Sequence, residues 1–413
     1  MDRIVKNVED VQNVNNVKRV THAYFSFSTF FTYFTFFAML MLCGCGGRQV
    51  RTQVEGVAPG GGIVKVLLET GVNTFTVKTE APFKVVDEET QAVVATGANE
   101  KMTIVFGEKG LVVAGQPVKA TSLRLMSDAP WSFGNHRYRG RLLVRCSKEG
   151  QMLLVNELSI EEYLYGVVPR EMSSQAPLEA LKAQAVAART YAYFRMMRSG
   201  TSYDVDTTAL TQVYGGVVAE RPSAVQAVNA TRDQVLTYEN RMAQTPYHAN
   251  SGGKTEDVVN VWGFALPYLK GKELLSYCNW SPNFRWTAKM SWAKLEAALM
   301  KSGIPAKGFE GIEVVDRYWS ERVKTLRILT NGEWKVVKAN DFRKSLGNQF
   351  LRSTRFSVTA QADSVLFEGF GWGHGVGLCQ DGAVGMAKQG ASYEEILKKF
   401  YEGVTLKKIV AGS

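Results

Sequence analysis

A glutamate in an apolar turn is the first candidate for chemistry in this sequence. Glu171 stands two residues after Pro169, in the stretch Gly166-Val-Val-Pro-Arg-Glu-Met172. Apolar surroundings disfavour the ionised form of a carboxyl group and raise its pKa. A carboxyl group with a raised pKa can act as a general acid near neutral pH. Glu171 is therefore a candidate acid and base catalyst, and the alternative is an ordinary solvated glutamate before a helix.

Two cations follow on the helix predicted from Pro177 to about Met197. Proline suits the first helical position, and Lys182 and Arg189 are seven residues apart on one face. We expect them to orient Glu171, to stabilise charge in the site or to bind a sugar carboxylate, and the alternative is two solvated helix cations. The other face is apolar and mostly small, which predicts close packing onto a sheet; it carries Leu178, Leu181, Ala185, Ala188 and Ala192.

Two glycine-containing segments supply further candidate binding residues. The loop His248-Ala-Asn-Ser-Gly-Gly-Lys-Thr255 is not a G-x-S-x-G nucleophile elbow, so we interpret Ser251 and Gly252 as ligand contacts. In Gly369-Phe-Gly-Trp-Gly-His-Gly-Val-Gly377 the glycines recur at every second residue. An extended strand of this kind has one bare face and suits either a flat polymer such as a sugar chain or close strand packing in a core. The segment and the residues after it add four candidate substrate contacts: Trp372, His374, Gln380 and Asp381.

A zinc site is an alternative use of some of these residues. His248, His374 and Cys379 together with a water molecule have the ligand types of a catalytic zinc site. Their spacing matches no recognised zinc motif, and the sequence holds no CxxC pair. We therefore expect neither a metal nor another cofactor. The three widely spaced cysteines Cys146, Cys278 and Cys379 also form no disulfide framework.

The N-terminal residues predict export. Lys18 and Arg19 precede an uncharged, phenylalanine-rich run from Ala23 to Leu42, and small residues follow. This order is typical of a signal peptide. The sequence Leu42-Cys-Gly-Cys45 resembles a bacterial lipobox, which makes Cys45 the expected lipidated residue, and the alternative is an uncleaved membrane anchor. We expect the protein to lie in the cell envelope outside the cytoplasm, as a membrane-anchored lipoprotein.

The elements that must position these residues predict an α+β fold. Short alternating strands fill the chain from Ile63 to about Pro130, and helices and further strands follow. We expect a mostly antiparallel β-sheet core with packed helices, preceded by a small β-rich module. The net charge of +10 suits an anionic partner, but no nucleic-acid-binding motif is present, so we expect no nucleic acid.

Together the motifs resemble the stage II sporulation protein D and amidase-enhancer (LytB) family. The resemblance runs in order from about Trp131 to the C-terminus, which makes residues 131–413 a SpoIID/LytB-like domain. The composition of the preceding residues predicts a signal peptide (1–44), a Gly-rich, basic tether (45–62) and a β-rich module (63–130). The matching segments include Glu162-Tyr-Leu-Tyr-Gly-Val-Val-Pro-Arg-Glu-Met172, Ala180-Leu-Lys-Ala-Gln-Ala-Val-Ala-Ala-Arg-Thr-Tyr191, Thr211-Gln-Val-Tyr214, His248 to Thr255 and Gly371-Trp-Gly-His-Gly-Val-Gly-Leu-Cys-Gln380.

The resemblance implies action on the cell wall. The sporulation branch is similar to lytic transglycosylases that cut peptidoglycan glycan strands bare of stem peptides, with the glutamate matching Glu171 as acid and base and the lysine matching Lys182 in support. The amidase-enhancer branch implies a non-catalytic role that stimulates a separate cell-wall amidase. Cys379 and Asp381 depart from the family pattern, which has serine and tyrosine there, and the zinc ligands of some members are missing.

A single glutamate favours transglycosylation over hydrolysis, because hydrolysis of a glycosidic bond usually needs two carboxylates. Asp381 and Asp206 stay open as partner carboxylates.

Overall fold

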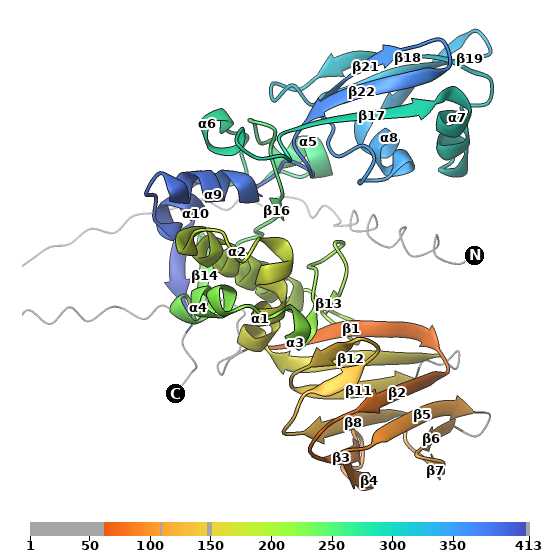
Figure 1. Cartoon of the computed structure of the whole chain (residues 1–413), viewed down its shortest axis with the longest axis vertical. Coiled ribbons are helices and arrows are strands. Elements are labelled where there is room, and N and C mark those ends of the chain that lie inside the picture. The colour runs from red at the N-terminus through yellow and green to blue at the C-terminus, as the bar shows by residue number, and fades with distance from the viewer. Residues whose placement is uncertain (1–61, 108–109, 147–150, 410–413) are drawn as a thin grey trace, which may run out of the picture. The chain divides into compact units, whose positions relative to one another are not determined.

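The computed structural model describes residues 62–107, 110–146 and 151–409 (Figure 1). The predicted signal peptide, Cys45 and all of the predicted tether except Gly62 lie outside these ranges. No helix within the described ranges has the length and apolarity that crossing a bilayer requires. Helices combine with mostly antiparallel sheets, which confirms the predicted α+β class.

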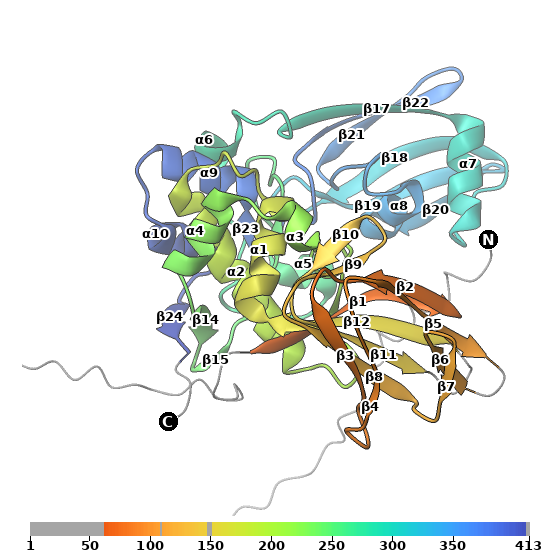
Figure 2. The ribbon, with the colours of Figure 1, turned by 60° about the horizontal axis from the view of Figure 1, so that its bottom comes forward.

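The N-terminal part is a β-module of two sheets with a shared apolar core (Figure 2). One sheet has the order β13-β1-β12-β11-β8-β3-β4 and the other β10-β9-β2-β5-β6-β7. Alternation along the strands produces the core, as in β2, where the buried Phe75 and Val77 alternate with the exposed Thr74 and Thr76. The strands are β1 (Ile63–Val72), β2 (Thr74–Lys78), β3 (Pro82–Asp87), β4 (Val93–Ala98), β5 (Lys101–Gly107), β6 (Gly110–Val113), β7 (Gln116–Val118), β8 (Ser122–Ser127), β9 (Trp131–Phe133), β10 (His136–Tyr138), β11 (Arg141–Cys146), β12 (Met152–Ser159) and β13 (Val205–Asp206).

The sequence predicts paired strands around Leu142-Leu-Val144 and Leu153-Leu-Val155, and these are β11 and β12, which pair in antiparallel register. Strand β12 also pairs with β1. Each sheet therefore contains strands from both sides of residue 130, where we placed a domain boundary. That boundary stays a prediction.

A helical cluster follows the β-module. Its centre is α2, which packs against four helices and also against strand β14, so the predicted packing onto a sheet is only part of its environment. Alanines fill half of its buried positions and allow this close approach. The cluster comprises α1 (Ile160–Glu171), α2 (Leu178–Met196), α3 (Gly216–Ala219), α4 (Pro222–Ala230), α9 (Gln380–Lys388) and α10 (Tyr393–Phe400), with the small sheet of β15 (Arg241–Met242), β14 (Gln234–Tyr238) and β24 (Thr405–Lys408).

Helix α1 determines where Glu171 lies. Ser159 with Glu162 is a capping-box pattern that predicts a helix start, and the helix begins there, with the Ser159 hydroxyl accepting a hydrogen bond from the Glu162 N–H. From the sequence we expect this helix to end at Gly166, and that prediction is wrong, because the helix passes through Gly166 and Pro169 and ends at Glu171. Gly166 is required for packing instead, since a side chain there would meet the Tyr214 ring 2.7 Å from its Cβ. Glu171 is thus the last residue of a helix and not a turn residue.

Residues 285–370 form two further three-stranded sheets with a core of their own. The sequence predicts a helix from Trp292 to about Lys301, and the structure has a helix with those bounds. The elements are β17 (Arg285–Ser291), α7 (Trp292–Lys301), β18 (Phe309–Arg317), β19 (Val323–Thr330), β20 (Glu333–Lys338), α8 (Ala339–Leu346), β21 (Phe356–Ala360) and β22 (Ser364–Phe370).

Two short strands join this part to the helical cluster. Strand β16 (Tyr247–His248) pairs in parallel with β23 (Leu378–Cys379), immediately before α9 begins at Gln380. This pairing brings the His248 loop beside the start of α9, although 131 residues separate Ala249 from Gln380. The remaining helices are α5 (Val258–Trp262) and α6 (Leu275–Cys278).

The glycine-rich segment is not the extended strand that its spacing predicts. Gly371, Gly373, Gly375 and Gly377 all have positive φ angles, between 71° and 118°, so the backbone turns repeatedly after β22. Each of the four also lies against other atoms, and a Cβ on Gly375 would be 2.3 Å from the Arg322 guanidinium. The glycines therefore allow an irregular backbone to pack closely against neighbouring residues.

Candidate active site

Glu171 lies in a cleft of about 370 Å³ between the end of α1 and one face of α9. Of the described residues predicted to carry function, three line this cleft: Glu171, Gln380 and Asp381. The remaining lining residues are Met172, Ser173, Gln175, Ala176, Pro177, Ala249, Trp280, Asn283, Val384 and Lys388.

Opposing effects act on the Glu171 carboxyl group, and burial is the largest. Burial raises its pKa above the ordinary value, and the adjacent end of α1, where the helix dipole is negative, also disfavours the ionised form. The Val213 N–H donates to Oε1 at 2.8 Å, and hydrogen bonds from Gln380 and Tyr247 also favour the carboxylate. The net effect is a raised pKa.

A second layer of buried polar groups holds the partners of Glu171. Gln212 Nε2 donates to the Tyr247 hydroxyl at 2.9 Å, and the Tyr163 hydroxyl donates to Gln212 Oε1 at 3.2 Å. On the α9 side, Gln380 Nε2 donates to Gln184 Oε1 at 3.3 Å. This network connects α1, α2, the segment before α3, β16 and α9, so it fixes the geometry of the carboxyl group.

Sequence reasoning missed four side chains of this network: Tyr163, Gln184, Gln212 and Tyr247. The signal was present, because Gln212 and Gln184 lie inside segments that match the family pattern and Tyr247 directly precedes the His248 loop. The sequence did not reveal that β16 pairs with β23, and this pairing brings the segments together.

Asp381 is a second carboxylate in the same cleft. Its Oδ2 accepts hydrogen bonds from Ser281 Oγ at 2.6 Å, Asn250 Nδ2 at 3.0 Å and Asn283 Nδ2 at 3.2 Å. Asp206 was the other candidate for a second carboxylate. It does not line the cleft, and its Oδ1 accepts hydrogen bonds from Thr208 and Thr211.

Lys182 contacts another acid. Its ammonium forms an ion pair with Glu179 Oε1 at 2.6 Å and lies 5.6 Å from the centre of the Tyr393 ring. The contacts of the described residues include no bond between Lys182 and Glu171.

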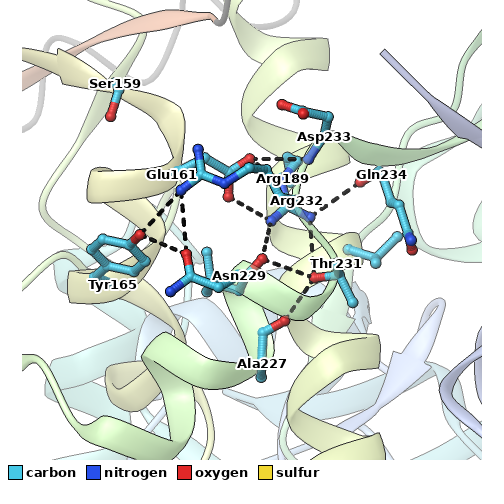
Figure 3. A network of polar contacts seen from close by, with 12 residues as sticks. Ser159, Glu161, Tyr165, Arg189, Ala227, Asn229, Thr231, Arg232, Asp233 and Gln234 are labelled. Atoms are coloured by element: carbon cyan, nitrogen blue, oxygen red, sulfur yellow. Dashed lines mark hydrogen bonds and ion pairs between the residues drawn. The ribbon is translucent and has the colours of Figure 1, made fainter. Parts of the chain in front are cut away.

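Arg189 lies in the core of the helical cluster beside Glu161 (Figure 3). None of its described hydrogen bonds or ion pairs involves Glu171. Its guanidinium is fully buried and binds Glu161 at both ends, with Nε to Oε1 at 2.8 Å and Nη2 to Oε2 at 2.7 Å. Further bonds reach the carbonyl oxygens of Val228 and Gln234. The structure thus differs from the predicted role of Arg189, because its position on α2 faces α1 and α4.

His248, Ser251 and Gly252 are packed behind the cleft and do not line it. Both His248 and Ser251 are buried, and the Ser251 N–H donates to Cys379 Sγ at 3.2 Å. Gly252 has a positive φ of 70°, and a Cβ there would lie 2.7 Å from the Phe370 backbone. The loop therefore packs against the end of β22, and the closely approaching partner is protein backbone.

Trp372 and His374 also lie outside the lining of this cleft. The Arg352 guanidinium stacks over the Trp372 ring at 4.5 Å. His374 Nδ1 accepts from the Val376 N–H at 3.0 Å and Nε2 contacts the Tyr247 carbonyl at 3.0 Å, so Nε2 carries the proton. Burial, reinforced by Arg343 and Arg322, lowers the pKa of His374 to about 3, which keeps the ring neutral.

The zinc alternative finds no support in the described part of the chain. No group of three or more histidine, cysteine, aspartate or glutamate side chains is placed there to hold a metal ion. His374 uses both ring nitrogens in backbone contacts, and Cys379 Sγ accepts from the Ser251 and Gly382 N–H groups.

Comparison with known proteins gives two domain matches and several relatives. A family described as stage II sporulation protein matches residues 148–238, and a domain of unknown function (DUF8618) matches residues 272–377. A stage II sporulation protein D from Bacillus amyloliquefaciens is 34% identical over 269 residues, which cover 61% of this chain and 75% of the relative. An uncharacterized protein of Brachyspira hyodysenteriae is 33% identical over 347 residues, covering 83% and 92%. An amidase enhancer of Bacillus subtilis is 30% identical over 291 residues, covering 59% and 40%.

Proposed function

Because this chain belongs to the stage II sporulation protein D family, we propose that it acts on peptidoglycan as a lytic transglycosylase with Glu171 as its single acid and base. The observation that carries the proposal is the placement of Glu171 in a cleft, with a pKa raised by burial and three hydrogen-bond donors around its carboxyl group. A carboxyl group with a raised pKa can donate a proton and can then, as the carboxylate, accept one.

The reaction needs two proton transfers through Glu171. First, protonated Glu171 gives its proton to the glycosidic oxygen while the bond from the anomeric carbon to that oxygen breaks. The Glu171 carboxylate then takes the proton of the sugar's own 6-hydroxyl while that oxygen bonds to the anomeric carbon. The products are a new chain end, a 1,6-anhydro sugar and Glu171 in its original protonated state.

The neighbours of Glu171 support the carboxylate that exists between these two steps. The Val213 N–H, the Tyr247 hydroxyl and the Gln380 amide are held in place before the substrate arrives. Donors fixed in advance stabilise charge that develops during a reaction without reorganisation at that moment.

The proposal includes a location in the cell envelope, outside the cytoplasm. Peptidoglycan is found there, and the predicted signal peptide with Cys45 as a lipid-anchored residue would retain the protein at a membrane. The net charge of +10 suits the anionic groups of the wall.

Product analysis tests the proposed reaction. Peptide-free glycan strands are digested with the wild type, Glu171→Gln and the control Glu310→Gln, whose residue is exposed on β18. Anhydro-ended fragments are expected from the wild type and the control, and cleavage by Glu171→Gln should fall at least ~100-fold. Reducing ends that carry an added water would contradict the proposal and would indicate hydrolysis with Asp381 as the second carboxylate.

The second candidate function is a non-catalytic, wall-binding enhancer of a cell-wall amidase. The relative described as an amidase enhancer favours it. In this case Glu171→Gln and the wild type should stimulate an added amidase equally, and neither should release anhydro-ended fragments. The same two proteins therefore separate the two functions.

A further inference from the structure

Trp280 gives the cleft an aromatic wall beyond the catalytic carboxyl group. It lies just after α6, and its side chain is 46% exposed. Indole Nε1 donates to the Tyr277 carbonyl at 2.9 Å, which fixes the orientation of the ring. A fixed and exposed aromatic ring in a cleft is a surface on which a sugar ring can pack.

Lys388 places a positive charge at this ring. Its ammonium lies 4.0 Å from the centre of the Trp280 ring, and both side chains line the cleft of Glu171. Asp381 and Lys388 are seven residues apart on α9, so they share one face and lie about 10 Å apart along the helix axis.

The ammonium of Lys388 has no acidic partner among the ion pairs of residues 62–107, 110–146 and 151–409. In contrast, Lys182 is paired with Glu179 and Arg189 with Glu161. Lys388 is therefore a cation of the cleft that a ligand can use without first breaking an ion pair.

We infer that Trp280 and Lys388 form a subsite for a muramic acid residue whose lactyl carboxylate is free, and that Lys388 is the residue that selects peptide-free glycan. This inference rests on the proposed action on peptidoglycan. In a glycan without stem peptides the lactyl group ends in a carboxylate, which pairs with an ammonium. A stem peptide converts that carboxylate into an amide, which removes the charge.

The subsite explains why the predicted cations need not contact the sugar. We expected Lys182 or Arg189 to bind a sugar carboxylate, yet both are committed to glutamates. Lys388 reaches the cleft from α9, and Trp280 comes from the segment that matches the domain of unknown function. Neither residue belongs to the segment that matches the sporulation family.

The test measures binding without cleavage. All variants are made in the full chain with Glu171→Gln, and two probes are titrated calorimetrically. One probe is a peptide-free GlcNAc–MurNAc oligomer, and the other is the same oligomer with every lactyl carboxylate converted to a methylamide.

The parent protein should bind the carboxylate oligomer about fivefold more tightly, as expected for one partly exposed ion pair. Lys388→Met keeps the aliphatic chain over Trp280 and should reduce this ratio to about one, whereas Lys388→Arg should retain most of it. Trp280→Ala should weaken the binding of both oligomers. The matched control is Lys399→Met, an exposed lysine on α10 outside the cleft, which should leave the ratio unchanged.

A ratio that survives Lys388→Met, or that Lys399→Met removes equally, would overturn the inference. Equal binding of the two oligomers by the parent protein would also overturn it. These outcomes are separate from the fate of the proposed reaction, because a protein that releases no anhydro-ended fragments can still show the Lys388-dependent ratio.

Discussion

At the scale of single residues, the state of Glu171 depends on a balance between burial and hydrogen bonding. Burial favours the protonated acid, whereas Val213, Gln380 and Tyr247 favour the carboxylate. The raised pKa shows that burial prevails. Each donor is therefore expected to affect the pH range in which the group can act.

Tyr247→Phe tests this balance. The change removes a donor that lowers the pKa of Glu171, so the pKa should rise further. An acid is active below its pKa, so the fall of kcat on the alkaline side should move to higher pH. The rate constant itself should fall about tenfold, because the carboxylate formed during the reaction loses one hydrogen bond.

A pH–rate profile with peptide-free glycan strands measures both effects. The control is Tyr401→Phe, which removes a buried hydroxyl bonded to the Pro246 carbonyl at 2.8 Å. This control should reduce stability without moving the alkaline limb. An alkaline limb that stays in place in Tyr247→Phe would show that Tyr247 does not influence Glu171.

At the scale of elements, helix α2 is held by an ion pair inside the helical cluster. Arg189 of α2 and Glu161 of α1 are buried and form two parallel hydrogen bonds. The additional bonds to carbonyl oxygens near α4 satisfy the rest of the guanidinium. Loss of one partner would leave the other charge buried and unpaired, which strongly lowers the free energy of unfolding.

Arg189→Met should therefore reduce the free energy of unfolding by about 3–5 kcal/mol, whereas the double variant Arg189→Met with Glu161→Met should recover much of the loss. Lys182→Met should change it by less than about 1 kcal/mol, because that ion pair is partly exposed. Urea unfolding followed by circular dichroism gives these values. A stable Arg189→Met variant that cannot cleave glycan would instead support a role for Arg189 in the reaction.

At the scale of the whole molecule, the chain has 49 basic residues and 39 acidic residues, which gives a net charge of +10. An excess of this size attracts an anionic polymer over a distance that salt limits to about 10 Å at 0.1 M and about 3 Å at 1 M. The wall contains such polymers, so charge is expected to contribute to binding there in addition to the contacts of the cleft.

Binding to purified peptidoglycan should therefore weaken as sodium chloride is raised from about 0.1 M to about 1 M. Sedimentation of the Glu171→Gln protein with insoluble wall fragments measures the bound fraction without digestion. Sucrose at matched osmolarity is the control and should leave binding unchanged. Binding that is indifferent to salt would show that the net charge plays no part.

The local sequence specified much of the fold. Capping boxes at Ser159 and Ser392 correctly predict the starts of two helices, since a hydroxyl and a glutamate three residues later act within one turn. Alternation likewise predicts the strands of the β-module. The predicted end of α1 was wrong because a glycine often marks the end of a helix. In this structure Gly166 lies inside the helix, and its lack of a side chain makes room for the Tyr214 ring.

The candidate site was only partly accessible from the sequence. Local apolarity and the family motifs identified Glu171, and the motif after the glycine run identified Gln380 and Asp381. The sequence could not separate these residues from Arg189, Ser251 or His374, because residue type does not show which groups are already bonded to protein. Folding decides that by pairing β16 with β23 and by placing α9 opposite the end of α1. The sequence by itself determined which side chains are chemically able to act as acids, bases or ligands. Only the tertiary structure decided which of them line the cleft, because it decides which groups are already bonded to protein.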